Sequence, residues 1–208
     1  MPTLECISFN TSACTPEEAA EDLIVWTNET HDRMEYRIAK KPPRLPSLYP
    51  LEGIQKFASQ RWNNETTAII SVDVLTVRGM SIVRSVLKRK IGDSHVSYHG
   101  RIHIPFRDFA FEIKIKTAPV TAPTGRETQL RAEHENNEDA TLPWEQDPYL
   151  PDHRSDFLCC ESDNGDYDAR FPEDPLTLLR QELVKIVSSI ATIREVRNAV
   201  PFQGNISA

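Results

Sequence analysis

The strongest constraint on the fold is a series of alternating runs between residues 67 and 117. In residues 109–117 apolar side chains alternate with mostly charged ones, in the order FAFEIKIKT. Successive side chains of a strand point to opposite faces, so this run predicts a strand with one face in a core and one toward water. Residues 67–77, which alternate from Ile70 onward, and residues 96–106 have the same character. We therefore expect an antiparallel sheet at the centre of the molecule.

Further segments complete the predicted sheet. Residues 23–26 and 34–38 read as two short strands around a polar turn, and Arg78-Gly79 reads as a two-residue turn into residues 80–90. The apolar spacing within 80–90 would also suit a helix. The short turn and the β-branched content favour a strand.

Two helices are predicted from spacing and capping signals. Residues 51–62 carry apolar side chains at steps of three and four, which fits one face of a helix. Thr124 and Glu127 match a capping box, so a second helix should begin at Gly125 and run toward Glu135.

The clearest helix is predicted for residues 174–199, with Asp174 as N-cap and Pro175 as the first helical residue. Its apolar stripe is the buried side of a helix on a sheet or, alternatively, a seam for a second helix or a second copy of the chain. The stripe consists of Leu176, Leu179, Leu183, Ile186, Ile190 and Ile193.

These elements predict one α+β domain over residues 1–208, an antiparallel sheet with helices packed on it as an α/β/α sandwich. A sheet with a single covering helix is the alternative. Only 39% of residues are hydrophobic, which is too few for a core of the whole length. We assign the remainder to a loose lead-in, residues 1–21, and to an acidic, largely irregular loop, residues 136–171.

Charge is distributed unevenly along the chain, whose net charge is −7. Residues 78–116 hold nine Lys/Arg against three Asp/Glu, and residues 127–174 hold fifteen Asp/Glu against three Lys/Arg. The basic residues could form a phosphate-facing stripe, or the acidic segment could fold back over them and cover it. The stripe would consist of Arg84, Lys88, Arg89, Lys90, Arg101 and Arg107.

The sequence also excludes several classes of protein. No run approaches the roughly 20 apolar residues of a membrane helix, and the first residues lack a secretory signal. The four cysteines form no C-x-x-C pair, so we expect free thiols in a cytoplasmic protein. None of the common nucleotide, hydrolase or metalloprotease motifs occurs. We therefore expect no cofactor.

Two apparent metal sites fail on geometry. His95, His99 and His103 recur every four residues, but on a strand each step spans about 13 Å, too far for one ion. Placing Gly165 at the sixth position of a calcium loop puts Cys160 first and Phe171 last, where carboxylates are required. Weak cation binding by Asp163, Asp166 and Asp168 is the alternative.

Three motifs resemble those of a family of uncharacterised bacterial proteins. They are Ile104-Pro-Phe-Arg-Asp-Phe109, Thr124-Gly-Arg-Glu127 and Tyr167-Asp-Ala-Arg-Phe-Pro-Glu-Asp-Pro-Leu176. The order of strands and helices is also similar to the PsbP-like fold. Members of that fold bind other proteins, so the resemblance implies a binding role rather than catalysis.

The leading hypothesis is a non-enzymatic protein-binding module of the adaptor, chaperone-like or immunity type. The alternatives are a small-molecule-binding or hydrolytic domain and, last, nucleic-acid binding through the basic sheet. We expect another protein as partner, with self-association through the C-terminal helix as a further option. The expected partner site is where Arg107 and Asp108 meet the acidic segment around Trp144 and Tyr167.

Overall fold

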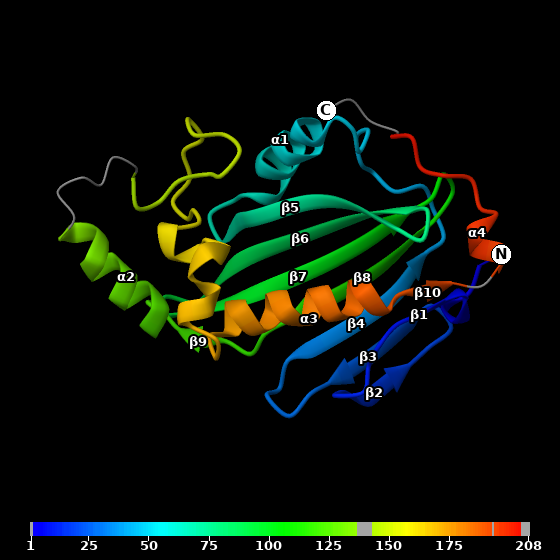
Figure 1. The fold of residues 1–208 in the computed structure, drawn as a ribbon, viewed down its shortest axis with the longest axis horizontal. Helices are drawn as coiled ribbons and strands as arrows, with labels where there is room; N and C mark the ends of the chain where they lie inside the picture. The colour runs from blue at the N-terminus through cyan, green and yellow to red at the C-terminus, as the bar shows by residue number, and fades with distance from the viewer. Residues whose placement is uncertain (1, 137–142, 193, 205–208) are drawn as a thin grey trace.

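The computed structural model describes residues 2–136, 143–192 and 194–204. Its centre is an antiparallel sheet in the order β2-β3-β4-β8-β7-β6-β5, with β9 paired to β7 (Figure 1). The α+β prediction is confirmed. The strands are β2 (Thr15–Ala19), β3 (Leu23–Thr27), β4 (Arg33–Ala39), β5 (Thr67–Val77), β6 (Met80–Ile91), β7 (His95–Pro105), β8 (Ala110–Lys116) and β9 (Val120–Thr121).

The turn between β5 and β6 settles the ambiguity of residues 80–90. Val77 pairs with Met80 across two residues, Arg78 and Gly79, whose φ angles are 51° and 81°. Two consecutive positive φ angles are the geometry of a tight hairpin turn that matches the twist of the flanking strands. The segment that follows is strand β6, and the helix alternative is wrong.

One face of the sheet is covered by helix α3 (Pro175–Ser189), which runs lengthwise over the strands in Figure 1. Asp174 caps it, its Oδ1 accepting from the Leu176 N–H at 3.0 Å. The described part of the predicted stripe lies in the main core, so it is the buried side of a helix on a sheet; Ile193 falls outside the described residues. The fit is close at Gly100 of β7, where a Cβ would lie 2.9 Å from both Leu183 methyl carbons.

The other face is covered only in part, by helix α1 (Leu51–Trp62) at the β5 edge. Ile54, Phe57 and Ala58 of α1 form a second core with Ile69 and Leu87. Helices therefore lie on both faces, as in a sandwich, and the alternative of a single covering helix is wrong.

Helix α2 (Gly125–Glu135) begins where its capping residue predicts, with Thr124 Oγ1 accepting from the Glu127 N–H at 3.2 Å. The described part of the acidic segment, residues 143–171, contains two short 3₁₀ helices, η2 (Glu161–Asp163) and η3 (Gly165–Arg170). The rest of this described part has no helix, and its only pairing is an isolated bridge from Glu145 to Cys160.

The outer edge of β5 is partly occupied by side chains. The Val72 N–H donates to the Tyr149 phenol oxygen at 2.6 Å, and the Gln55 amide donates to the Val72 carbonyl at 3.2 Å. Tyr149 is itself placed by Asp147, a carboxylate only 1% exposed, which accepts from the Tyr149 N–H and from Ser59 of α1, each at 2.8 Å.

The prediction that residues 1–21 form a loose lead-in is wrong. They contain a 3₁₀ turn, η1 (Leu4–Cys6), strand β1 (Ile7–Ser8) and strand β2. Leu4, Cys6 and Ile7 are buried in the main core, and the Tyr36 hydroxyl donates to the Leu4 carbonyl at 3.0 Å. Short apolar segments of this kind acquire structure only from distant partners, which local periodicity does not reveal.

The prediction of one helix over residues 174–199 is also wrong at its end. Helix α3 stops at Ser189 because Ile190 adopts φ −55° and ψ 123°. The chain then forms β10 (Ala191–Thr192), which pairs with β1, and a short helix α4 (Arg194–Arg197). Pairing with the N-terminal strand thus overrides the continuing helical spacing.

Replacing Gly100 with Val should destabilise the fold because the added side chain enters the space of Leu179 and Leu183. Overpacking of this kind costs about 1–3 kcal/mol. The matched control is Gly125→Ala, where an added Cβ meets nothing within 4 Å. Urea unfolding should give a lower midpoint for Gly100→Val only; equal midpoints for the two variants would contradict this packing.

Candidate functional site

The four residues expected to form a partner site lie at two separate places. Arg107 and Asp108 form the turn after β7 and pair with each other at 2.8 Å, with side chains 63% and 64% exposed. The Arg107 N–H donates to the carbonyl of Val200, so this turn meets the C-terminal segment rather than the acidic segment.

Trp144 and Tyr167 lie at the opposite end of the strands. The Tyr167 hydroxyl donates to Glu161 at 2.8 Å, Glu161 also contacts His134 Nδ1 at 2.5 Å, and the His134 ring packs on Trp144. In β7, Tyr98 lies at this end of the sheet. Tyr98 precedes Arg107 by nine residues, and nine residues span about 30 Å along a strand. The structure therefore does not bring the four predicted residues together.

A buried ion-pair network holds the acidic segment to the sheet. The Lys88 side chain of β6 is 4% exposed, and its Nζ lies 3.4 Å from carboxylate oxygens of both Glu127 and Asp163. Burial lowers the pKa of Lys88, but the neighbouring carboxylates, chiefly Asp163, raise it more, so the net pKa lies above its ordinary value. Lys88 is therefore a permanent cation in the folded protein.

A second buried cation organises the 3₁₀ turns. Arg126 of α2, whose side chain is 2% exposed, donates to the carbonyls of Ser162 and Asn164 and to Asp168. Arg180 of α3 shares Asp168 at 2.7 Å. Lys88 forms an ion pair with Asp163, and these two arginines form ion pairs with Asp168. Two of the three carboxylates that were considered as ligands of a bound cation are therefore already neutralised by cations of the protein.

The two adjacent cysteines in this network are poor nucleophiles. Burial raises the pKa of Cys159, and burial together with Asp163 raises the pKa of Cys160 to about 12. Both thiols are therefore protonated at neutral pH. Within the described residues, no three His, Cys, Asp or Glu side chains gather closely enough to hold a metal ion.

The acidic segment covers only part of the basic sheet. Lys88 is buried beneath it, and Arg84 is paired with Asp73 at 2.8 Å. The side chains of β4, β8, β7 and the end of β6 that point away from α3 lie beyond the α1 core and form what we call the open sheet face. It consists of Arg33, Glu35, Arg37, Arg89, Ser97, His99, Arg101, His103, Glu112, Lys114 and Lys116.

Charges on the open sheet face are incompletely paired. Glu112 contacts Arg37 at 2.5 Å and Lys114 at 3.4 Å, and Arg33 contacts Glu35 at 3.1 Å. By contrast, three cations have no carboxylate within 4 Å among the residues that the structure describes. These are Arg89, Arg101 and Lys116, which line a depression of about 230 Å³.

His99 lies among these cations, and their positive charge affects its pKa. Burial, followed by the charges of Arg101, Arg89 and Lys116, lowers the pKa of His99 to about 4. Burial lowers the pKa of Arg101, and the neighbouring arginines lower it further, although the charge of Glu112 opposes this shift. A small cavity of about 130 Å³ adjoins the same strands, and the His103 Nε2 atom is buried beside it without a hydrogen-bond partner.

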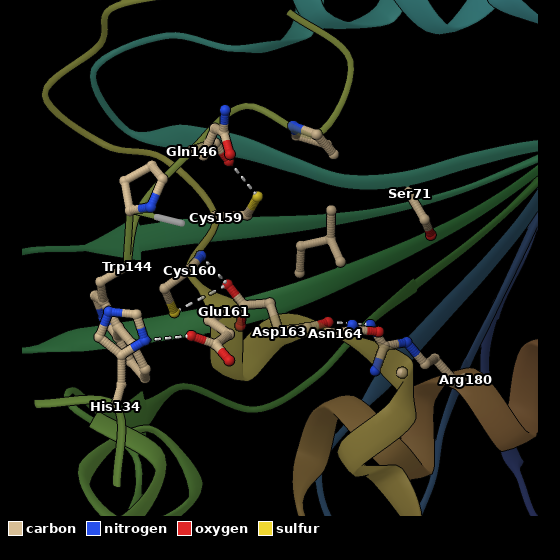
Figure 2. Close-up of a pocket in the computed structure, with 14 residues that line it drawn as sticks. Ser71, His134, Trp144, Gln146, Cys159, Cys160, Glu161, Asp163, Asn164 and Arg180 are labelled. Atoms are coloured by element: carbon tan, nitrogen blue, oxygen red, sulfur yellow. Dashed lines mark hydrogen bonds and ion pairs between the residues drawn. The ribbon is translucent and has the colours of Figure 1, made fainter. Parts of the chain in front are cut away.

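A larger cavity of about 560 Å³ lies on the opposite face, between β5, residues 143–165 and α3 (Figure 2). Ile70 and Ser71 of β5, Trp144 and Gln146 of the acidic segment, and Arg180 of α3 line it. The sequence points to Arg89 and Arg101 of the open sheet face and to Trp144 of the cavity, but it places Arg89 and Arg101 in one stripe with Arg84, Lys88 and Lys90, and it does not identify Lys116, Ser71, Gln146 or Arg180. The sequence signal for the open sheet face is the set of polar side chains at every second position of residues 96–106 and 109–117.

Comparisons with known proteins show only a distant likeness of fold. The Ran-binding protein Mog1p of Saccharomyces cerevisiae is 12% identical, covers 92% of each chain and has a TM-score of 0.48. The cyanobacterial PsbP protein of Synechocystis sp. PCC 6803 is 9% identical over 62% of this chain and 81% of that chain, with a TM-score of 0.36. A Bacteroides thetaiotaomicron protein is 11% identical over 62% and 43%, with a TM-score of 0.35.

No protein-family model and no curated protein matches the sequence. Among the described residues, none of the helices combines the length and the hydropathy needed to cross a bilayer. Similarity at this level concerns the arrangement of strands and helices and says nothing of binding or catalysis.

Replacing Lys88 with Met should be strongly destabilising because Asp163 and Glu127 would remain buried without a counter-charge. Removing one partner of a buried pair costs about 3–5 kcal/mol. Lys40→Met, which breaks an exposed pair with Glu21, serves as the control and should leave stability nearly unchanged. Equal urea midpoints for the two variants would show that the Lys88 network does not hold the fold.

Protonation of His99 should cost stability in mildly acidic solution. Its pKa of about 4 in the folded chain lies below the ordinary value near 6.5, so the unfolded chain binds more protons between these values. Stability from this group is present above pH 6.5 and is lost as the pH falls toward 4. His99→Gln should flatten the pH dependence of the urea midpoint, and an imidazole NMR titration that gives an ordinary pKa for His99 would contradict the prediction.

Proposed function

We propose that this protein is a binding module whose open sheet face takes an acidic segment of a partner protein. The observation that carries the proposal is the cluster of Arg89, Arg101 and Lys116, three cations on adjacent strands without a carboxylate within 4 Å in the described chain.

The cluster is electrostatically costly in the free protein. The lowered pKa of His99 traces first to burial and then to the positive charges of Arg101, Arg89 and Lys116. The pKa of Arg101 is lowered by burial and, against the opposing charge of Glu112, by neighbouring arginines. An anion bound among these side chains would be attracted to them and would offset the repulsion between the cations. Both effects are stronger because the site is partly desolvated. The face is therefore better suited to a negatively charged ligand than to being left empty.

The pattern of charge favours a protein segment over a nucleic acid. Glu35 and Glu112 lie among the cations of the open sheet face, and the whole chain carries a net charge of −7. A continuous phosphate backbone would meet those carboxylates, and long-range repulsion would oppose its approach. A peptide with spaced carboxylates can place its charges against the three unpaired cations and leave polar groups opposite the two glutamates.

The direct test measures binding of a fluorescein-labelled Glu-Ser repeat peptide by anisotropy, with a Lys-Ser repeat and single-stranded oligothymidylate as competing probes. The wild type should bind the Glu-Ser peptide, and affinity should fall with added salt. Changing Arg89, Arg101 and Lys116 together to Gln should weaken binding by about tenfold or more.

The matched control removes three positive charges elsewhere, at Lys41, Lys56 and Arg154, all exposed. It should bind as the wild type does. Equal weakening in the two triple variants would reduce the effect to net charge and overturn the proposal. Tighter binding of the oligothymidylate than of the Glu-Ser peptide would assign the face to nucleic acid instead.

A second readout is local to the site. Bound carboxylates should raise the pKa of His99 from about 4 toward its ordinary value, because they offset the charges of Arg89, Arg101 and Lys116. An NMR titration of His99 with saturating Glu-Ser peptide measures this shift. Binding without any change at His99 would place the peptide elsewhere on the protein.

A further inference from the structure

The cavity shown in Figure 2 is large enough for a small organic molecule. Its volume of about 560 Å³ falls within the roughly 300–1,000 Å³ of ligand pockets. Side chains from β5, α2, the acidic segment and α3 converge on it from different sides (Figure 2).

The walls of this cavity are held in place without a ligand. Asp163 is fixed by Lys88, the Asn164 carbonyl accepts from Arg126, and the Asp163 carbonyl accepts from Arg180. These contacts are buried or half-buried and charge-assisted, so they make the turn at 160–165 rigid. A pre-formed cavity lowers the ordering cost of binding.

The β5 side of the cavity is built from an irregular stretch of strand. The pairing of β5 with β6 shifts register between Ile69 and Ser71, which leaves Ile70 as the extra residue of a β-bulge. Bulges re-aim side chains and are frequent beside binding sites. Here both Ile70 and Ser71 line the cavity.

The charged groups around the cavity already have partners within the protein. Asp163 faces Lys88, Arg180 faces Asp168, and Glu161 contacts His134 and Tyr167. A charged ligand would have no counter-charge to meet and would lose its hydration on entry. The cavity therefore favours an uncharged ligand.

Several polar groups on the cavity lining remain available. The Trp144 indole N–H is buried without a hydrogen-bond partner in the described structure. Within the same described part, the Ser71 hydroxyl and the Gln146 side-chain amide also make no hydrogen bond of their own. The Trp144 N–H has almost no accessible surface, so the groups that a ligand can reach are the Ser71 hydroxyl and the Gln146 amide. A ligand with an acceptor atom would give these groups a hydrogen-bond partner that they lack in the free protein.

We infer that this cavity binds a compact, uncharged, largely apolar molecule that carries a carbonyl or a comparable hydrogen-bond acceptor. Ile70, Pro143 and Pro148 supply apolar walls, and Ser71 and Gln146 supply the donors. The site lies on the opposite side of the sheet from the open sheet face, so it does not depend on the function proposed for that face.

Ligand-observed NMR titration with benzamide tests the inference, because benzamide is planar, neutral and carries a carbonyl. Benzoate and benzylamine are charged probes of the same size. Benzamide should bind saturably, and the charged probes should bind at least about tenfold more weakly because their charge would be buried unpaired.

Two variants locate the bound probe. Gln146→Trp fills part of the cavity and should abolish benzamide binding, and Ser71→Ala removes a donor from the lining and should weaken binding severalfold. Val184→Trp, on the exposed side of α3, should change nothing. A proton–nitrogen correlation spectrum and Tm check that each variant is folded.

Three outcomes would overturn the inference. They are the absence of saturable benzamide binding to the folded wild type, binding that persists in folded Gln146→Trp, and benzoate or benzylamine binding as tightly as benzamide. Either of the last two would place the probe outside this cavity or assign it a different chemistry.

Discussion

The burial of Lys88 and Arg126 is the constraint on which the arrangement of the acidic segment depends. A cation removed from water is stable only where carboxylates and carbonyls surround it. The chain meets this requirement because residues 160–168 return across the end of the sheet. There Asp163 forms an ion pair with Lys88, and Asp168 forms one with Arg126. A segment with few apolar residues is thereby fixed through ionic contacts rather than through a hydrophobic core.

The two faces of the sheet consequently differ in their charge balance. On the α3 face each buried cation has an anion from the acidic segment, and the remaining space is a neutral cavity. On the other face α1 covers the β5 edge, and Arg89, Arg101 and Lys116 have no carboxylate within 4 Å among the described residues. One sheet thus separates a surface suited to anions from a pocket suited to uncharged molecules.

Elements with a local signature were predictable from sequence, and those that depend on distant partners were not. Strands β5 to β8 and the starts of α2 and α3 follow from alternation and capping residues. Strand β1 and the early end of α3 arise from pairing between Ile7 and Thr192, which no local pattern encodes.

The site was less predictable than the fold. Arg107 and Asp108 belong to the motif of residues 104–109, which made them candidates for a site. In the structure they form a turn at the opposite end of the strands from Trp144. Lys88 could have been singled out, since it falls at an inward position of β6, in step with Ile82 and Val86. An inward lysine in a strand implies a buried partner, although the sequence alone does not say which carboxylate supplies it.

The contacts at Val72 bear on how the molecule behaves at high concentration. An exposed edge strand can template the addition of a strand from a neighbouring molecule and start aggregation. Tyr149 and Gln55 engage the N–H and carbonyl of Val72 near the middle of an eleven-residue edge. The Tyr149 phenol and the Gln55 amide therefore occupy the backbone groups that a neighbouring chain would need to extend the ladder across the middle of this edge.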